Sequence, residues 1–407
     1  MPPLGDPNQG GHVMSKRMER EVWALDRCSG CGLCVATCSK GMLYWDEEAR
    51  HPVREVRQKR LGLTQIPLDT CTFCQVFCEE TCPRLHQWEE VPARRVVSAK
   101  AKGPVESGEP MEVIRALLIA NLSAGAIDGV IASDVDGWAL QPRAKVMTRV
   151  EELADNLAVQ GLWVPTLDVL NEAVYERKLR NIAVVGTPCV SEAVRTVKAS
   201  DNERLNPYKD ALRLSVAVFC TGVYYPGPVR QFLEERMGIA GREVKRVYVS
   251  PRDKELRVIV WDGSEKSVPL SKIEGYSRAG CATCDDLLGE SADIAVGKVG
   301  AKEGYSTLIV RSEVGEQCLQ NAVDLGLLEV NTEVNEEALR TAKEEKERRD
   351  RAQAFDDLML MMLDALREPQ RRAEVREEFV RLYGVDSLSD SVREETRHGA
   401  CAQCAGC

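Results

Sequence analysis

The sequence predicts an α/β protein built from three parts. Two four-cysteine runs near the N-terminus indicate a small metal-binding domain over residues 1–92. Strand-like and helix-like segments then alternate over residues 93–330, which is typical of a sheet covered by helices. A highly charged stretch with helical periodicity follows and predicts a helical extension over residues 331–407. With 407 residues, the chain is long enough for more than one core.

The two cysteine runs predict iron–sulfur clusters. The first run has the spacing C-x2-C-x2-C-x3-C, which is that of bacterial ferredoxins, where the fourth cysteine of each run binds the other run's cluster. The second run keeps the following proline, Pro83, but has one extra residue between Cys74 and Cys78. We therefore predict a bacterial-ferredoxin-like domain with two [4Fe–4S] clusters. The predicted ligands are Cys28, Cys31, Cys34, Cys38, Cys71, Cys74, Cys78 and Cys82.

Structural zinc is the main alternative for these cysteines. Zinc sites are tetrahedral and are usually built from two separated pairs of ligands, whereas each run here packs four cysteines into a short segment. The spacing favours a cubane cluster in both runs. A disulfide framework is disfavoured because the chain is long and no secretory signal is expected.

Charge and hydropathy argue against two classes of function. The net charge is −10, and no basic stripe is present that would bind a nucleic-acid backbone. No run of about 18 apolar residues occurs, so no membrane-spanning helix is expected. With sixteen cysteines and no export signal, we expect a cytoplasmic protein, including one docked on a membrane complex.

The order of the remaining elements follows from local patterns. The region 41–70 is charged and predicts an inserted surface loop, and 98–110 predicts a linker. Thr148 and Glu151 form a capping box at the start of one helix. The predicted helices are 111–122, 148–158, 167–179 and 229–237; the predicted strands are 126–133, 181–185, 214–219, 244–249, 256–261, 293–296 and 307–310.

The C-terminal part combines a charged helical stretch with a cysteine tail. The helical pattern covers 336–383, and its Met/Leu stripe at 358–366 predicts packing against the main body or a partner. The tail carries Cys401, Cys404 and Cys407, which is one thiolate short of a cubane's four. Either another group completes a cluster there, or the tail is a terminal redox or metal-trapping segment.

A second group of cysteines lies where predicted strands end. Its members are Cys189, Cys220, Cys281 and Cys284. Thr187 and Pro188 predict the start of a helix, so Cys189 lies in a first turn where the helix dipole favours a thiolate. Because the carboxyl ends of neighbouring strands face one crevice, these thiols can meet at one more [4Fe–4S] cluster. The alternative is two buried structural cysteines and a separate C-x2-C dithiol. Cys318 predicts a core thiol.

Five segments between residues 91 and 311 form a specific combination in a specific order. They are Ala-Ile-Asp-Gly-Val-Ile (126–131), Ala-Val-Val-Gly-Thr-Pro-Cys (183–189), Val-Phe-Cys-Thr-Gly (218–222), Cys-Ala-Thr-Cys-Asp (281–285) and the glycine-containing stretch 292–311. With these segments, residues 91–311 resemble the beta subunit family of deazaflavin-coenzyme-reducing hydrogenases and dehydrogenases. An N-terminal ferredoxin domain is a common addition in this family.

The resemblance implies cofactors, ligands and partners. It implies an FAD-binding α/β domain with a third [4Fe–4S] cluster held by the second group of cysteines. It also implies hydride exchange with the deazaflavin coenzyme F(420), after which the flavin delivers single electrons through the clusters to a partner protein. The implied cofactor-binding residues are Gly186, Thr187, Pro188, Gly297, Gly300, Gly304, Ser306 and Thr307. For the last five, a tight turn between two strands is the alternative.

Two other functions remain open at this point. Segments 106–118 and 156–165 differ from the family's usual glycine-containing segments, so an electron-transfer adaptor without its own substrate site is one alternative. A reductase of another organic substrate, such as a tetrapyrrole, is the other. No G-x-G-x-x-G or Walker pattern is present, which gives no support to nicotinamide or ATP binding.

Overall fold

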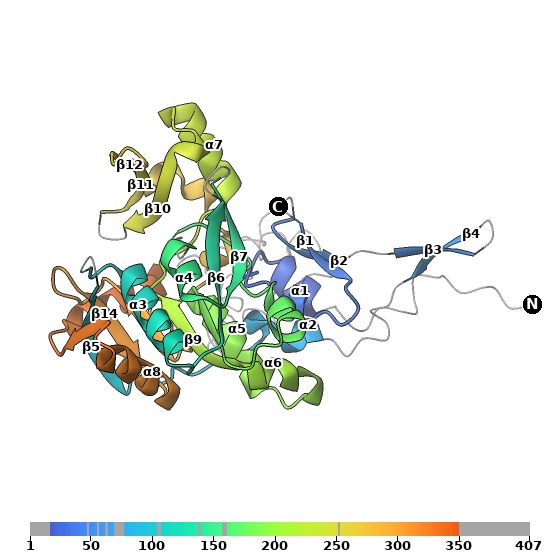
Figure 1. Cartoon of the computed structure of the whole chain (residues 1–407). Coiled ribbons are helices and arrows are strands. Elements are labelled where there is room, and N and C mark those ends of the chain that lie inside the picture. Colours follow the sequence, from blue (N-terminus) through green and yellow to red (C-terminus); the bar gives the residue numbers. More distant parts are fainter. Residues whose placement is uncertain are drawn as a thin grey trace, which may run out of the picture. The chain divides into compact units, whose positions relative to one another are not determined.

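A computed structural model describes residues 17–46, 49–54, 57–61, 64–68, 77–103, 107–136, 140–156, 161–250 and 253–349 (Figure 1). Residues 1–347 belong to one compact unit, and residues 348–407 belong to a second. The fold below is that of the first unit. The cysteine tail and the Met/Leu stripe of the extension lie outside the described residues.

An eight-stranded mixed sheet organises the α/β part, in the order β15-β5-β14-β13-β9-β8-β6-β7 (Figure 1). Strands β6, β8, β9 and β13 are parallel, and antiparallel strands complete both sides. The strands are β5 (Arg95–Ala101), β6 (Gly129–Asp136), β7 (Gln141–Met147), β8 (Ile182–Gly186), β9 (Leu212–Val218), β13 (Ile294–Gly297), β14 (Ser306–Val310) and β15 (Leu328–Asn331).

The central strands are apolar on both faces because helices cover both. Ala183 and Val185 of β8 face one core, while Ile182 and Val184 face the other. The first core contains residues of α3 (Pro110–Ser123), α4 (Val150–Asn156) and α8 (Glu313–Asp324), including the buried Cys318 as predicted. The second core contains residues of η4 (Glu172–Glu176), α5 (Pro188–Ala199), η5 (Glu203–Leu205) and α6 (Asn206–Ala211).

A smaller antiparallel sheet forms a separate core beside the main one. Its strands are β10 (Val244–Ser250), β11 (Glu255–Val260) and β12 (Glu265–Pro269), and the β10–β11 pair confirms the predicted antiparallel pairing. Helix α7 (Pro226–Met237) packs on this sheet through Val229 and Leu233. Short helix η6 (Gly241–Glu243) joins α7 to β10, and η7 (Leu270–Lys272), η8 (Glu274–Tyr276) and η9 (Ala279–Cys281) follow β12 and lead back to β13 of the main sheet.

The N-terminal part has short helices and two hairpins. The helices are η1 (Met18–Trp23), α1 (Leu33–Ala36), α2 (Phe77–Glu80) and η3 (Pro83–Leu85). The predicted surface loop at 41–70 is wrong in its described residues, because they pair as β1 (Leu43–Asp46) with β2 (His51–Arg54) and as β3 (Arg57–Leu61) with β4 (Thr64–Leu68). The charged residues that suggested a loop are compatible with such hairpins.

The predicted linker at 98–110 is wrong over residues 98–101. Its first residues belong to β5, whose Val97, Ala99 and Ala101 are buried in the first core. The polar Ser98 is tolerated inside the sheet because its hydroxyl donates to the carbonyl of Glu333 at 2.6 Å. Alternation with small and polar residues thus hid an internal strand.

Two helix starts differ from their predictions. Helix α4 begins at Val150, so Glu152 rather than Glu151 reaches back, and its carboxylate accepts from the amides of Thr148 and Arg149. The predicted helix at 167–179 is reduced to η4 and the turn before it, because the chain at 163–167 is used in contacts with the cysteine domain. Lys178, with a left-handed φ of 57°, ends it. No described helix is long and apolar enough to cross a membrane.

Candidate iron–sulfur centres

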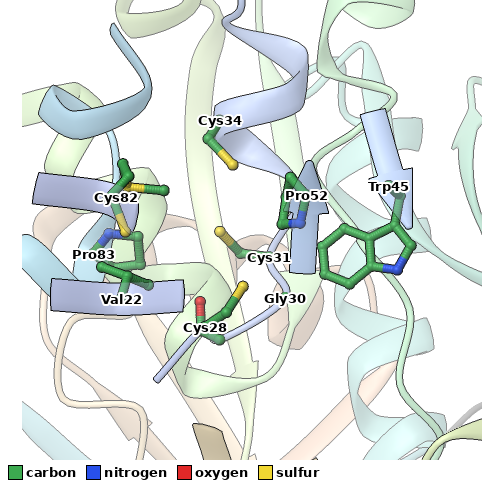
Figure 2. A pocket seen from close by; sticks show the side chains of 12 residues that line it. Val22, Cys28, Gly30, Cys31, Cys34, Trp45, Pro52, Cys82 and Pro83 are labelled. Atoms are coloured by element: carbon green, nitrogen blue, oxygen red, sulfur yellow. The ribbon is translucent and has the colours of Figure 1, made fainter. Parts of the chain in front are cut away.

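The first candidate centre is formed by cysteines from both runs. Cys28, Cys31 and Cys34 come from the loop before α1 and from α1 itself, while Cys82 precedes η3. Together they line one small pocket. Figure 2 shows the four side chains around this shared space. The fourth cysteine of the second run therefore joins the first three of the first run, as the ferredoxin spacing predicts.

Burial keeps these thiols protonated until a positively charged group replaces the protons. Burial raises the pKa of Cys31 and Cys34, and it raises that of Cys82 strongly. Neighbouring thiolates raise these pKa values further. A backbone amide, that of Leu33, opposes the shift at Cys31. The donor set is four sulfurs and no oxygen, which suits iron–sulfur or zinc rather than a hard cation.

The second ferredoxin centre is described only in part. Cys38 accepts a hydrogen bond from the amide of Met42 at 3.2 Å, and it packs with Cys78 against the core of the N-terminal part. Cys71 and Cys74 lie outside the described residues. Between the two runs, Thr37 and Thr81 share a hydroxyl contact of 3.2 Å, which ties α1 to α2.

The other group of cysteines lies at the carboxyl end of the parallel strands. As predicted, Thr187 is the N-cap of α5 and Pro188 is its first residue, so Cys189 lies in the first turn. The hydroxyl of Thr187 is 3.0 Å from the sulfur of Cys189. Cys220 follows β9, and Cys281 ends η9, three residues before Cys284.

These four thiols are close enough to influence one another's ionisation. Burial, together with the charges of Cys281 and Cys284, raises the pKa of Cys220 to about 12, although the charge of Lys346 opposes the shift. Burial likewise raises the pKa of Cys189, with contributions from Cys284 and Cys220. The structure therefore brings all four predicted residues into one region. Within the described residues, no three His, Cys, Asp or Glu side chains lie close enough together to bind a single metal ion.

Two buried cations, which the sequence patterns did not single out, face this second thiol site. Lys346, from the helical segment 336–349, donates to the sulfur of Cys284 at 3.6 Å. Arg84, from η3, lies near Cys284 and Cys189 and is 4.0 Å from Glu192. Burial alone lowers the pKa of both cations, but the surrounding negative charge outweighs it and raises both. The sequence offers one signal for Arg84, which directly follows the Cys82-Pro83 pair, and none for Lys346.

The two thiol sites touch each other through the backbone. Gly280, which precedes Cys281, packs so closely on Cys28 that a Cβ there would lie 2.3 Å from the Cys28 carbonyl oxygen. Arg84 makes a second link, because its guanidinium donates to the Gly280 carbonyl at 3.4 Å and its backbone amide supports the sulfur of Cys82. The first and second sites are thus adjacent in the fold.

A fully buried arginine lies at the same junction. Arg278 is 1% exposed and donates to the carbonyl of Cys28 at 2.8 Å. Its guanidinium stands over the rings of Trp163, Trp45 and Tyr225 at 4.7, 5.4 and 5.3 Å from their centroids. Its Nε and Nη1 have no hydrogen-bond partner in the described part of the chain. Its positive charge therefore faces the Cys28 thiol and aromatic faces.

The segment 156–165 has a role in this junction. Its Trp163 donates from Nε1 to the carbonyl of Gly30 at 3.0 Å. Just after the segment, the amide of Leu167 donates to the backbone carbonyl of Cys31 at 2.8 Å. Gly32 has a φ of 86°, and a Cβ there would meet the backbone of Pro165 and Asp168. The residues that differ from the family's usual pattern thus hold the first cysteine loop.

The predicted flavin residues are mostly occupied by the chain itself. A Cβ at Gly297 would meet the ring of Phe219 at 2.0 Å, and one at Gly300 would meet the Asn335 carbonyl oxygen at 2.9 Å. The hydroxyls of Ser306 and Thr307 donate to backbone carbonyls, at 2.6 and 2.7 Å. These contacts fit the tight turn between β13 and β14, which is the alternative interpretation of these residues.

The remaining members of that predicted set differ from one another. A Cβ at Gly186 would lie 2.8 Å from the Cβ of Val190. Thr187 is the N-cap of helix α5, and Pro188 is its first residue. Gly304 has a φ of 79°, and a Cβ there would meet nothing within 4 Å. The assignment of all eight residues to FAD stays a prediction.

Comparison with known proteins gives two family matches. Residues 179–336 match the model for the C terminus of the coenzyme F(420) hydrogenase/dehydrogenase beta subunit, and residues 27–85 match a 4Fe-4S dicluster domain. The second match establishes the N-terminal part as an iron–sulfur domain.

Individual relatives agree with these matches. The chain is 32% identical to an uncharacterized protein of Methanocaldococcus jannaschii, over 82% of this chain and 97% of the relative. It is 30% identical to the coenzyme F(420) hydrogenase subunit beta of Methanococcus voltae, over 58% of this chain and 83% of that subunit. It is 30% identical to the coenzyme F(420)-dependent sulfite reductase of M. jannaschii, but it spans only 50% of that protein.

A solved structure shares the fold. A chain of the F(420)-reducing [NiFe] hydrogenase complex of Methanosarcina barkeri matches with a TM-score of 0.58 and 23% identity. The match covers 65% of this chain and 92% of that one. The predicted mixed α/β architecture is therefore confirmed.

Proposed function

This chain belongs to the family of coenzyme F(420) hydrogenase/dehydrogenase beta subunits, and on that premise we propose that it is an iron–sulfur subunit that passes electrons between coenzyme F(420) and a partner protein. A [4Fe–4S] cluster, when bound, accepts or gives up one electron at a time. The relatives of this family are named as oxidoreductase subunits, which supports the class of reaction. The identity of the partner and of the hydride carrier belongs to the proposal.

The observation that carries the proposal is the adjacency of two four-thiol sites. In the proposed function, one cluster is held by Cys28, Cys31, Cys34 and Cys82. Another cluster is held by Cys189, Cys220, Cys281 and Cys284. The contact between Gly280 and Cys28 brings the two ligand sets together without an intervening layer of side chains. The remaining N-terminal cluster is assigned to Cys38, Cys71, Cys74 and Cys78. Such an arrangement suits transfer of single electrons within one chain.

The protein's own groups prepare both sites for negative charge. Arg84 and Lys346 face the second site, and Arg278 faces the first, so each buried set of thiolates has a buried cation beside it. The backbone packs tightly at Gly280 and Gly32, so no side chain fits between the segments there. Aromatic rings of Trp45, Trp163 and Tyr225 complete its wall.

A hydride carries two electrons, so exchange with coenzyme F(420) calls for a group that separates the pair, and FAD supplies this chemistry when bound. In the turn at 297–307, Gly297 and Gly300 pack closely on other residues, and the hydroxyls of Ser306 and Thr307 donate to backbone carbonyls.

That occupied turn favours a second candidate function. In it the chain is an electron-transfer adaptor, which takes single electrons from a flavin-bearing partner and has no substrate site of its own. The use of segment 163–168 to hold the cysteine loop agrees with this alternative. Both functions use the same thiol sites and differ in whether a flavin is bound.

The visible spectrum of anaerobically purified protein separates the two functions. If the first is right, a flavin shoulder accompanies the broad iron–sulfur band, and reduced coenzyme F(420) bleaches both. Iron–sulfur absorbance without flavin, unchanged by the reduced coenzyme, would establish the adaptor. Absence of any iron–sulfur band in freshly reconstituted protein would refute both.

A further inference from the structure

The second thiol site is closed by a lysine from outside the matched family region. Lys346 belongs to the helical segment 336–349, which follows the family match at 179–336. We propose that Lys346 is a positioning residue for the redox chemistry, which compensates the negative charge of the Cys189–Cys220–Cys281–Cys284 site and thereby raises its reduction potential. This inference rests on the proposed cluster at that site.

The contacts of Lys346 are directed at the thiol site and not at solvent. The residue is 6% exposed. Its ammonium donates to the carbonyl of Cys220 at 2.8 Å, to the carbonyl of Asp286 at 2.6 Å and to the sulfur of Cys284 at 3.6 Å. An ammonium has three donors, so these three contacts use them all.

No carboxylate neutralises this ammonium within ion-pair distance in the described ranges. Asp286 is close in space and its charge acts on Lys346, but its carboxylate oxygens accept from the amides of Gly289 and Glu290, at 2.7 and 3.0 Å. A buried charge without a counterion is costly, so its presence beside sulfur indicates that the thiol site supplies the negative charge.

Lys343 shows the difference on the same segment. It lies three residues earlier and forms ordinary ion pairs with Glu90 at 2.6 Å and with Glu290 at 2.5 Å. Those contacts hold the helical segment on the main body. Lys346 instead directs its ammonium at Cys284. Lys343 therefore holds the helical segment in place, whereas Lys346 compensates the charge of the thiol site.

The consequence for electron transfer follows from electrostatics. Reduction adds one negative charge to a cluster whose four thiolate ligands already make it anionic, and a cation nearby favours the reduced form. Removal of the Lys346 charge therefore lowers the reduction potential of this cluster. The N-terminal cluster at Cys28, which has Arg278 and Arg84 beside it, keeps its potential.

The test is a redox titration of the full-length protein followed by electron paramagnetic resonance, with Lys346→Gln, Lys346→Arg and the matched control Lys343→Gln. We expect Lys346→Gln to lower the midpoint of one cluster by about 59 mV or more, which is a tenfold change in its one-electron equilibrium. Lys346→Arg keeps the charge and stays near wild type, and Lys343→Gln shifts the midpoint far less.

Each other outcome has a defined meaning. An unchanged midpoint in Lys346→Gln, or an equal shift in Lys343→Gln, overturns the inference while leaving the proposed function intact. If Lys346→Gln fails to load this cluster, normal loading in Lys346→Arg supports the charge role, and loss in both overturns it. Wild-type protein with N-terminal clusters only refutes the proposed third cluster, and the inference falls with it.

Discussion

Replacing Gly280 by alanine tests whether the two thiol sites are packed directly together. The added Cβ would lie 2.3 Å from the carbonyl oxygen of Cys28, 2.9 Å from its carbonyl carbon and 3.1 Å from the carbonyl carbon of Arg27. All three are backbone atoms, so no side chain can rotate away. The N-terminal part and η9 have to separate.

The expected cost follows from overpacking. Inserting a methyl group into a well-packed interior costs about 1–3 kcal/mol of unfolding free energy. Gly280 does not have a left-handed φ, so alanine brings no backbone strain there. Alanine also restricts the unfolded chain, which adds about 0.4–1 kcal/mol to the unfolding free energy. Steric conflict dominates, and we expect a net loss of roughly 1–2 kcal/mol.

The assay is anaerobic chemical denaturation of the iron-loaded protein, with Gly275→Ala as the matched control. A Cβ at Gly275 meets nothing within 4 Å, so that variant keeps or slightly gains stability. A lower denaturation midpoint in Gly280→Ala alone supports the packed junction. Equal midpoints in the two variants would refute it.

Three further predictions concern charge and ligation. Cys82→Ser should lose the iron of one N-terminal cluster, measured by colorimetric iron analysis, whereas Cys318→Ser, which changes a core thiol, should keep all iron. Arg278→Met should lower the unfolding free energy by about 2–4 kcal/mol through the lost hydrogen bond and ring contacts, and the denaturation midpoint measures it. Burial raises the pKa of Glu192 from its usual 4.5 to about 7 despite Arg84 nearby. A carboxyl with a raised pKa adds stability at low pH and loses it as pH rises through about 7, so Glu192→Gln should remove up to about 3 kcal/mol of that pH dependence, followed by denaturation at several pH values.

Much of the first thiol site could be predicted because its ligands are close in the sequence. The spacing of Cys28, Cys31 and Cys34 leaves little freedom for a short loop, and the crossing of Cys82 follows from the repeated run. The start of α5 was also predictable, since Thr187 and Pro188 are local signals that act within one turn. Strand β8 was found by its continuous apolar run.

Other features depend on contacts between distant residues, which local patterns do not carry. The polar Ser98 makes strand β5 look like a linker in the sequence. The strand tolerates this residue because its hydroxyl donates to the carbonyl of Glu333, more than two hundred residues away. Lys346 looks like one of many solvated charges on a helix until the fold places it on Cys284. Gly280 gives no signal either, because its requirement for glycine comes from the backbone of Cys28.

Iron content combined with electron paramagnetic resonance tests the central claim most directly. If both thiol sites and the second ferredoxin site hold cubanes, anaerobically reconstituted wild-type protein carries about 12 iron ions per chain, and Cys284→Ser carries about 8 with one signal missing. Equal iron content in wild type and Cys284→Ser, with N-terminal signals only, would contradict the account.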